Sequence, residues 1–412
     1  MTGERAPRAR GPRRALTNVG GPVETRGDRH VAEILGRALD VDTDESASRA
    51  HVHGFHSYPA RLHPDVARTC IDALSPKGAV VLDPFCGSGT VLVEARLLGR
   101  PAYGTDLNPL AIRLAELKAV GRDAAHRGKL LAEAERVMDV ATERRKKRSG
   151  ASRRYPASDV GEFEMHVLLE LDGPRVGIEA TPDPRVRGDL ALVLSSMLTK
   201  LSRRAGDTSE RAVEKRIAAG FPSRLFVGKT RELVERLAEY ERMLPPNAPV
   251  PRIAEDDART LASVPPRSID VVVTSPPYPG NYDYLAHHAT RLRWLDLPVN
   301  RFRDAEIGAR RRLENESADA AEKTWRTDLA GVLRALARSL RRDGGIVLVL
   351  ADSVVAGRPF FNDAITEQAA KEARLRVIAR ASQARPHFHR ASKDAFRGRP
   401  RREHAIALVP EG

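Results

Sequence analysis

Short apolar runs along the chain alternate with stretches of helical periodicity, and glycine or proline separates them. Ala79 to Leu82 predicts a strand that leads through a glycine-rich turn into an amphipathic helix from about Val91. Ala102 to Gly104 predicts a second strand, which ends near Asp106, and Asn108 then offers a helix N-cap before a proline. Two strand–helix units in series indicate a parallel sheet.

The same pattern returns in the last third of the chain. Val271 to Thr274 predicts a buried strand, and helical stretches follow near Leu285 to Leu295 and up to about Leu340. Further strands are expected at Ile346 to Leu350, Arg376 to Ala379 and Ala405 to Val409. The chain as a whole therefore reads as an α/β protein.

Residues 121–250 interrupt this alternation. They contain the basic run "RRKKR", a possible hairpin at "EFEMHVLLELDG", and helical stretches around 190–201 and 230–243. We expect four parts: a disordered basic arm over 1–45, a cofactor-binding half over 46–120, an inserted and mostly helical subdomain over 121–250, and a catalytic half over 251–412. Whether the insertion recognises a target is left open.

Charge points to a polyanionic partner. The 69 Lys and Arg residues exceed the 55 Asp and Glu residues, which leaves a net charge of +14. Arginine forms most of the surplus and suits phosphate groups, although a generally basic surface without a specific partner would look the same. Two cysteines provide no disulfide framework, so a reducing cytoplasm is expected. We expect neither a signal peptide nor a membrane span, because no stretch approaches ~20 apolar residues.

The stretch "DPFCGSGT", Asp83 to Thr90, places Gly87 and Gly89 in the turn between a strand and a helix. A backbone without Cβ atoms can approach a ligand closely there. Asp106 lies 23 residues after Asp83, at the end of the next strand, where a carboxylate can accept both hydroxyls of a ribose. The turn lacks the lysine of a P-loop and the third glycine of a dinucleotide motif, so the pattern favours a nucleoside cofactor.

The stretch "TSPPY" follows the strand that ends at Thr274. Its two prolines stop regular pairing and leave a stiff turn with one aromatic ring at the carboxyl end of the strand. In open parallel sheets that edge binds ligands, although an ordinary proline turn is the simpler alternative.

Together, "DPFCGSGT", "GTDLNP" and "TSPPY" resemble the amino-group DNA methyltransferases that use S-adenosylmethionine, with the serine-led tetrad typical of their N4-cytosine branch. The resemblance covers roughly residues 54–119 and 254–409. It implies a Rossmann-like methyltransferase fold with a seven-stranded, mostly parallel sheet and a largely helical insertion. It also implies a cofactor site. In that site "HSYPARLHP" contributes Tyr58 and "AEDDART" contributes Asp257. The other implied residues are Asp83, Phe85, Gly87, Gly89, Thr90 and Asp106.

The resemblance gives the tetrad its role. The Ser275 side chain and the Pro276 carbonyl would accept hydrogen bonds from an exocyclic amine, Pro277 would stiffen the turn, and Tyr278 would stack on the extruded base. The implied reaction is methyl transfer to N4 of cytosine in DNA. Adenine N6, RNA, and a non-catalytic cofactor-binding regulator stay as alternatives, with a protein amide as an outsider. A covalent attack on cytosine C5 is disfavoured, because Cys86 lies in the cofactor turn and no cysteine lies in the tetrad.

The remaining signals are weaker. His51, His53 and His56 lack a matching acidic partner in sequence, so no metal is expected. Asp283 and Tyr284 are candidates for the substrate side. The segment "ARPHFHRASKDAFRGRPRREH" reads as a loop that contacts a nucleic-acid backbone, or as a solvated basic hairpin. Its candidate contacts are Arg390, Lys393, Arg397, Arg399 and Arg401. The existence of a cognate restriction enzyme and the oligomeric state are left open.

Overall fold

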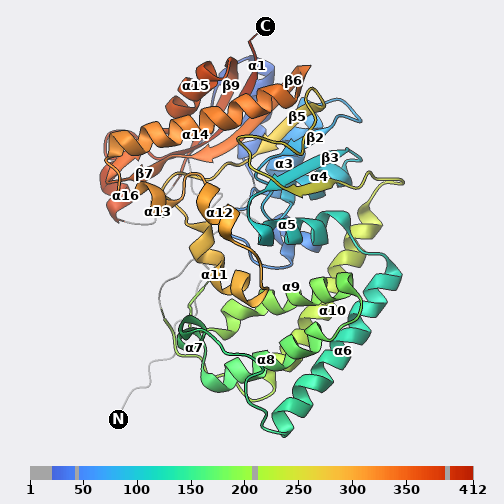
Figure 1. Ribbon diagram of the computed structural model, residues 1–412. Helices are drawn as coiled ribbons and strands as arrows, with labels where there is room; N and C mark the ends of the chain where they lie inside the picture. Colours follow the sequence, from blue (N-terminus) through green and yellow to red (C-terminus); the bar gives the residue numbers. More distant parts are fainter. Residues whose placement is uncertain (1–20, 42–45, 207–211, 386–389, 412) are drawn as a thin grey trace, which may run out of the picture.

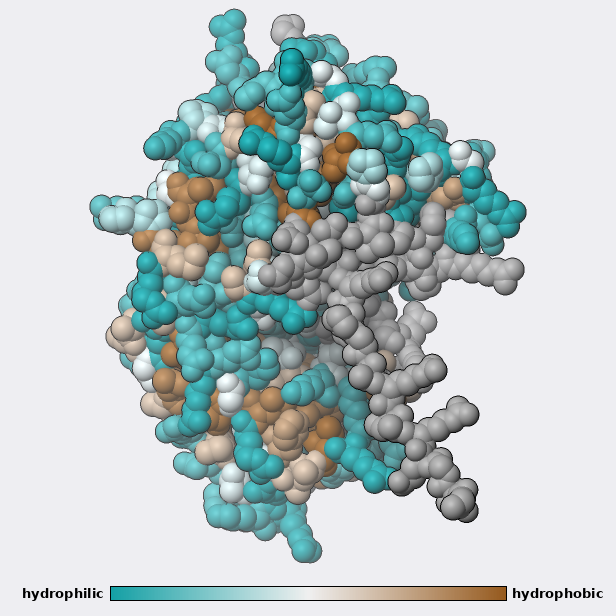
Figure 2. Space-filling model, turned by 180° about the vertical axis from the view of Figure 1, so that it is seen from behind, coloured by the Kyte–Doolittle hydropathy of each residue, from teal (hydrophilic) through white to brown (hydrophobic). Residues whose placement is uncertain are grey.

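The computed structural model describes residues 21–41, 46–206, 212–385 and 390–411 (Figure 1). An α/β part carries the sheet, and a lobe of long helices adjoins it. Among the described helices, none is long and apolar enough to cross a membrane. Seen from behind, hydrophilic side chains cover most of the described surface, and hydrophobic side chains gather in patches in the upper and the lower half (Figure 2).

One eight-stranded sheet runs in the order β1-β9-β10-β6-β5-β2-β3-β4. The pairings make β1 and β10 antiparallel to the other six strands, which are mutually parallel. The expected Rossmann-like fold is confirmed, but the expected number of seven strands is wrong, because β1 adds an eighth at one edge. The strands are β1 (Glu24–Gly27), β2 (Val81–Asp83), β3 (Ala102–Asp106), β4 (Arg252–Glu255), β5 (Ile269–Thr274), β6 (Leu340–Ala351), β9 (Leu375–Ala384) and β10 (Arg402–Pro410), and β7 (Ser353–Val355) pairs separately with β8 (Arg358–Phe360).

Helices cover both faces of this sheet. Along β6, Val347 and Val349 belong to one core cluster, whereas Ile346, Leu348 and Leu350 belong to the other. A strand buried on both faces reads as a continuous apolar run, which is what this sequence shows. The flanking helices and turns are α1 (Arg29–Leu39), α2 (Ser46–Arg49), η1 (His51–Gly54), α3 (Pro64–Leu74), α4 (Thr90–Leu97), α5 (Pro109–Ala115), η2 (Glu116–Val120), α11 (Tyr284–Trp294), α12 (Asn300–Ala305), α13 (Arg310–Leu313), α14 (Ala318–Ser339), α15 (Asn362–Glu372) and α16 (Arg390–Ala395).

The amino-terminal arm is not disordered throughout. Asp28 accepts a hydrogen bond from the Val31 backbone N–H at 3.0 Å and so caps α1, whose Leu35 and Leu39 are buried in the core. The turn before α1 needs glycine, because Gly27 has φ +97° and a Cβ there would lie 2.2 Å from the Ile378 carbonyl oxygen. The expected disorder is therefore wrong for 24–39, and residues 1–20 and 42–45 of the arm lie outside the described part.

After α5 and η2, five further helices of the described part fill the interval up to β4, and they form the lower lobe in Figure 1. The hairpin expected at 162–173 is wrong, since helix α8 occupies most of it. Gly173 and Gly177 let α8 approach α6 closely: a Cβ at Gly173 would lie 2.9 Å from the Ala141 Cα, and one at Gly177 would lie 3.0 Å from the Val137 Cα. The helices here are α6 (Ala124–Lys146), α7 (Ala157–Glu162), α8 (Met165–Glu179), α9 (Pro184–Leu201) and α10 (Phe221–Met243).

Candidate active site

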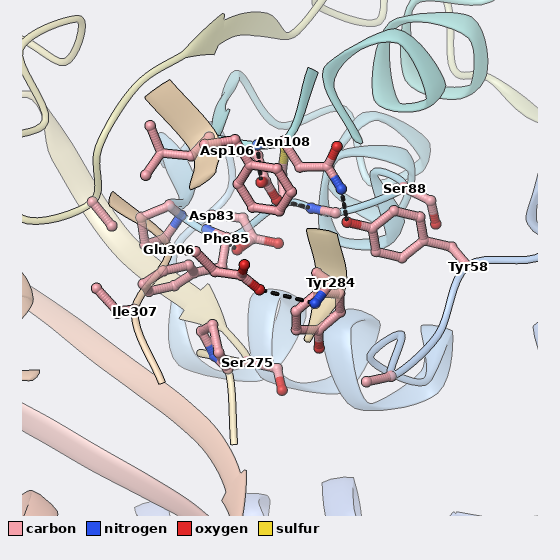
Figure 3. Close-up of a pocket in the computed structure, with 18 of the residues that line it drawn as sticks. Tyr58, Asp83, Phe85, Ser88, Asp106, Asn108, Ser275, Tyr284, Glu306 and Ile307 are labelled. Carbon is pink, nitrogen blue, oxygen red and sulfur yellow. Dashed lines mark hydrogen bonds between the residues drawn. The ribbon is translucent and has the colours of Figure 1, made fainter. Parts of the chain in front are cut away.

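A pocket opens where the glycine-rich turn, the end of β3 and the tetrad turn come together (Figure 3). Both glycines of the first turn have positive φ, +50° at Gly87 and +89° at Gly89. A Cβ at Gly87 would lie 3.2 Å from the Tyr58 ring, and one at Gly89 would lie 2.9 Å from the Ala115 Cα. The turn therefore keeps its shape only with glycine at these two positions.

Asp106 holds the floor of the pocket together. Its carboxylate accepts hydrogen bonds from the backbone N–H of Gly87 at 3.0 Å and of Asn108 at 2.8 Å. The Asn108 side chain caps α5 by accepting from the Leu110 N–H at 3.0 Å, and its amide donates to the Tyr58 hydroxyl at 3.2 Å. Sequence reasoning saw in Asn108 only a helix cap, because the contact with Tyr58 spans 50 residues.

The pocket is acidic although the protein is basic. Five carboxylates contribute to its lining, and the one Lys or Arg among the described lining residues is Arg61. The Arg61 guanidinium donates to the His53 carbonyl oxygen. These charges would repel the phosphates of a nucleotide and attract a nucleoside that carries a positive charge. The five carboxylates are those of Asp83, Asp106, Asp256, Asp257 and Glu306.

Burial shifts two of these carboxyl groups strongly. It raises the pKa of Asp83 to about 7, against the opposing hydrogen bonds from Thr274 and the Phe85 backbone N–H. It raises the pKa of Asp106 to about 6, although three backbone N–H groups favour the charged form. A cation bound in the pocket would favour the charged form of both groups.

Aromatic rings form one wall. The Tyr58 ring stacks on His288 with centroids 4.8 Å apart and lies 6.4 Å from the Tyr284 ring. Tyr284 begins α11, and its backbone N–H donates to the Glu306 carboxylate at 2.9 Å. Arg311 contacts that carboxylate from the other side, which places an ordered acidic group at the pocket rim. Glu306 carried no signal in the sequence, since it lies in a connection between two short helices.

The tetrad turn joins the pocket through a hydrogen bond from Thr274 Oγ1 to Asp83 Oδ1 at 2.6 Å. Ser275 and Pro277 line the pocket. The Ser275 hydroxyl donates over 3.5 Å to the Tyr278 hydroxyl, which donates at 3.2 Å to Glu403. Tyr278 does not line the pocket, and a residue of β10 accepts the hydrogen bond of its hydroxyl.

Glu403 is itself paired. Arg385 donates to its other carboxylate oxygen at 2.8 Å and also donates to the Gln383 side chain at 2.7 Å. Gln383 lies near the end of β9 and Arg385 directly follows it, so residues of β9 and β10 together support the tetrad. The sequence contained no indication of this network, because Glu403 lies 125 residues from Tyr278 in the chain.

The structure brings most of the sequence-predicted cofactor and tetrad residues to one pocket. Gly89 and Tyr278 flank it, and Pro276 is buried next to it. Sequence reasoning missed Ser88, Asn108, Asp256 and Glu306. The predicted residues that line the pocket are Tyr58, Asp83, Phe85, Gly87, Thr90, Asp106, Asp257, Ser275 and Pro277.

Three of the predicted nucleic-acid contacts are engaged with groups of the protein itself. Arg397 pairs with Asp394 at 2.7 Å on the surface. Arg399 pairs with Asp363 at 2.7 Å, and Arg401 donates to the Asp352 carbonyl oxygen at 2.9 Å. Lys393 is exposed on α16, whereas the Arg390 side chain lies outside the described part of the structure. Nucleic-acid contact by these residues stays a prediction.

The expectation that no acidic group accompanies the histidines is wrong. The Glu94 carboxylate forms a hydrogen bond with His53 Nε2 at 2.7 Å, and His51 lies next to this pair. Its second carboxylate oxygen accepts from Arg68 at 2.9 Å. Burial, with the neighbouring His53, lowers the pKa of His51 to about 4. Nearby cationic groups oppose the entry of a metal ion, and no metal is assigned.

Residues 35–117 match a family model described as DNA methylase, N6_N4_Mtase. The type II methyltransferase M.MvaI of Kocuria varians is 31% identical over 99 residues, which are 22% of each chain. A tRNA (guanine(10)-N2)-dimethyltransferase of Methanothermobacter thermautotrophicus is 38% identical over 78 residues, 18% of this chain and 23% of that one. Among solved structures, TrmN from Thermus thermophilus matches at 13% identity with a TM-score of 0.32, covering 85% of this chain and 49% of that one.

These matches confirm the resemblance to the amino DNA methyltransferases of the N6/N4 group, over the segment that carries the glycine turn and Asp106. They do not separate the cytosine branch from the adenine branch. The chain spans about a fifth of the length of the relatives M.MvaI and M.MjaII. S-adenosylmethionine is the cofactor that this family uses, and the acidic, aromatic pocket suits its nucleoside and its positive sulfur.

Proposed function

We propose that this protein transfers a methyl group from S-adenosylmethionine to an exocyclic amine of DNA, with N4 of cytosine as the expected position. The observation that carries the proposal is the 2.6 Å hydrogen bond from Thr274 to Asp83. It joins a pocket suited to a cationic nucleoside directly to a rigid turn whose acceptors suit an amine.

The pocket residues fit the cofactor in three respects. Asp106 lies at the end of β3, where it would hold the ribose hydroxyls. The Ser88 hydroxyl is buried without a hydrogen-bond partner among the described residues, and it lines the pocket. Asp83 and its acidic neighbours would balance the sulfonium charge. When bound, the cofactor supplies an electrophilic methyl group, and the other contributions come from the protein.

The tetrad would prepare the amine. An aromatic amine is a poor nucleophile because its lone pair is delocalised, so acceptors aimed at its hydrogens favour the reactive geometry. The Ser275 hydroxyl uses its proton toward Tyr278, which leaves its oxygen lone pairs for an amine N–H. The Pro276 carbonyl would be the second acceptor, and Tyr278 would stack on the base.

The position of methylation is the finer part of the proposal. A tetrad led by serine, as in "TSPPY", supports N4 of cytosine by its resemblance to that branch. An amine of RNA is the second candidate, and the similarity to a tRNA (guanine(10)-N2)-dimethyltransferase supports it. A non-catalytic cofactor-binding role would leave the tetrad turn without a use.

One experiment tests this function. Purified protein is incubated with isotope-labelled cofactor and with separate DNA and RNA pools, and the nucleosides are identified by mass spectrometry. We expect labelled N4-methylcytosine from DNA, and no label with Ser275→Ala at unchanged cofactor affinity. N6-methyladenine would correct the branch, and label in RNA alone would correct the substrate. C5-methylcytosine would contradict the amine mechanism, and no label in either pool would contradict the function.

A further inference from the structure

A second pocket, of about 240 Å³, lies between β1, β9, the start of β10 and the first turn of α15. Four arginines and two carboxylates line it, which leaves an excess of two positive charges, four minus two, in its lining. It is thus opposite in charge to the cofactor pocket. Its lining residues are Glu24, Arg26, Asp363, Arg380, Ser382, Arg399 and Arg402.

Strand register forces the arginines together. Arg26 of β1 lies directly opposite Arg380 of β9 in the antiparallel ladder. Like charges in this position are destabilising unless an anion lies between or beside them. Glu24 lies opposite Ser382 in the same ladder, and its carboxylate interacts electrostatically with Arg26 as well as with Arg402.

The two carboxylates are already engaged. Arg380 and Arg399 donate to the same oxygen of Asp363, at 2.6 and 2.7 Å, and Arg402 pairs with Glu24. Arg26 is exposed and makes no hydrogen bond or ion pair through its side chain with the described residues. The pocket therefore presents guanidinium groups whose charge the protein balances only in part, which is an arrangement suited to a phosphate group.

The pocket lies at the catalytic edge of the sheet. Because β9 is parallel to β5 and β6, its carboxyl end, with Arg380 and Ser382 nearby, meets the same edge as the tetrad. Arg402 directly precedes Glu403, the residue that accepts the hydrogen bond of Tyr278, so their two side chains point to opposite faces of β10 at this shared edge. A polynucleotide whose base reached the tetrad would carry its backbone across this edge.

We propose that this arginine pocket binds a backbone phosphodiester of the nucleic-acid substrate, close to the nucleotide that is methylated. The inference rests on the proposed function for the identity of the substrate. Arg399 was expected from sequence to contact nucleic acid, whereas Arg26, Arg380 and Arg402 come from three strands that only the sheet brings together. Free phosphate or pyrophosphate offers the same chemistry, so the test separates these sources.

The test compares Arg26→Ala and Arg26→Ala/Arg399→Ala with the wild-type protein. The control is Arg376→Ala, which removes one exposed arginine from the opposite end of β9. Fluorescence anisotropy gives the affinity for a labelled DNA duplex at several salt concentrations. Removal of one phosphate contact should flatten the plot of log affinity against log salt by about 0.9. We expect this in both test variants and not in the control.

The outcomes separate the pocket from the function. A slope equal to that of wild type in both test variants would overturn the pocket. The second measurement is calorimetry with inorganic pyrophosphate. If the variants lose pyrophosphate binding while the salt dependence of DNA binding stays unchanged, the pocket binds a free anion, and the backbone proposal is overturned. Nucleoside methylation by the wild-type protein is measured in parallel, so a failure of the function is recognised independently of the slopes. Arg26→Ala breaks no ion pair of the described structure, so this variant should fold and can still be tested if the double variant is unstable.

Discussion

At the scale of single residues, hydrogen bonds that lead away from the candidate cofactor pocket hold the tetrad. Ser275 donates to Tyr278, Tyr278 donates to Glu403, and Arg385 fixes Glu403. Burial is the main cause that raises the pKa of Tyr278 well above its usual value, so its hydroxyl keeps its proton. The hydroxyl therefore orients the serine, and the ring remains the candidate surface for the base.

Replacing Tyr278 separates ring from hydroxyl. Tyr278→Ala should leave cofactor affinity intact but nearly abolish turnover, because it removes base stacking of ~1–3 kcal/mol and the positioning that accompanies it. Tyr278→Phe should keep much of the activity and lower the free energy of unfolding by about 1 kcal/mol, because it removes the hydrogen bond to Glu403. Methylation rates and urea unfolding measure the two effects. A folded but inactive Tyr278→Phe would show that orientation of Ser275 by the hydroxyl is essential.

Asp106 and Tyr278 should differ in their effect on the cofactor. Asp106→Ala should weaken binding by about tenfold or more, which is about 1.4 kcal/mol, because it removes the acceptor for the ribose and the support of the Gly87 turn. Tyr278→Ala should change this affinity little. Calorimetric titration with S-adenosylhomocysteine, without DNA, compares them. Equal losses would mean that one of the two residues is assigned to the wrong site.

The buried carboxyl groups predict a pH dependence. With Asp83 at a pKa of about 7 and Asp106 at about 6, the free pocket loses protons as the pH rises through this interval. Affinity for the cationic cofactor should therefore rise between about pH 5 and about pH 8, and affinity for the uncharged sulfur of S-adenosylhomocysteine should rise less. Calorimetry at several pH values measures both. Identical pH profiles for the two ligands would contradict a role of these carboxylates toward the positive sulfur.

The same two groups should lower the stability of the free protein as the pH rises, whereas they should strengthen cofactor binding over the same interval. Their pKa values are raised in the folded protein by burial, so the folded state binds more protons than the unfolded state in this interval. Their contribution to stability is present below the unfolded pKa and is lost as the pH rises through about 6 and about 7. Bound cofactor should offset this loss.

At the scale of elements, close helix packing explains the wrong expectation at α8. Its sequence alternates enough to suggest a hairpin, but Val167, Leu168 and Leu171 are all buried, as on one face of a helix. Gly173 and Gly177 then decide how near α6 lies. Strand β1 was also not recognisable from sequence. Its four residues are all exposed, so they show no apolar pattern, and they form a strand because they pair with β9.

The close approach of these two helices can be tested by adding one methyl group. Gly173→Ala should destabilise the protein by about 1–3 kcal/mol, since a Cβ there would lie 2.9 Å from the Ala141 Cα and Cβ. Gly188→Ala in α9 is the matched control: nothing lies within 4 Å of its added Cβ, so it should be neutral or stabilise by up to about 1 kcal/mol. Urea unfolding compares the two. Equal stability of both variants would contradict the close approach of α8 to α6.

At the scale of the whole molecule, charge is segregated. The chain carries +14 overall, its cofactor pocket is acidic, and the arginine pocket lies on the same edge of the sheet. This arrangement would separate the candidate site for a cationic nucleoside from the proposed surface for a polyanion. The basic segment before β10 extends that surface through Arg397, which is exposed.

Replacing Arg397, Arg399 and Arg401 together by alanine should weaken DNA binding and flatten its salt dependence by about one unit for each phosphate that is no longer bound. Arg401 also donates to the Asp352 carbonyl oxygen, so part of its effect should appear as lower stability. Anisotropy titrations and thermal unfolding separate the two contributions. An unchanged slope would favour a solvated basic hairpin.

The sequence by itself determined the features that depend on neighbouring residues: the glycine turn, the cap at Asn108 and the apolar strands. These follow from backbone sterics and short-range periodicity, which a local pattern records. Such features sufficed to nominate the glycine turn and the tetrad as candidate site residues.

The tertiary structure alone decided the position of Glu306 at the pocket rim, the pairing of Glu403 with Tyr278, the eighth strand, and the arginine pocket. Each depends on polar or exposed residues whose partners lie far away in the chain. A charged side chain looks the same in sequence whether it faces water or a distant partner, because only the packing of the sheet and its helices fixes which charges meet.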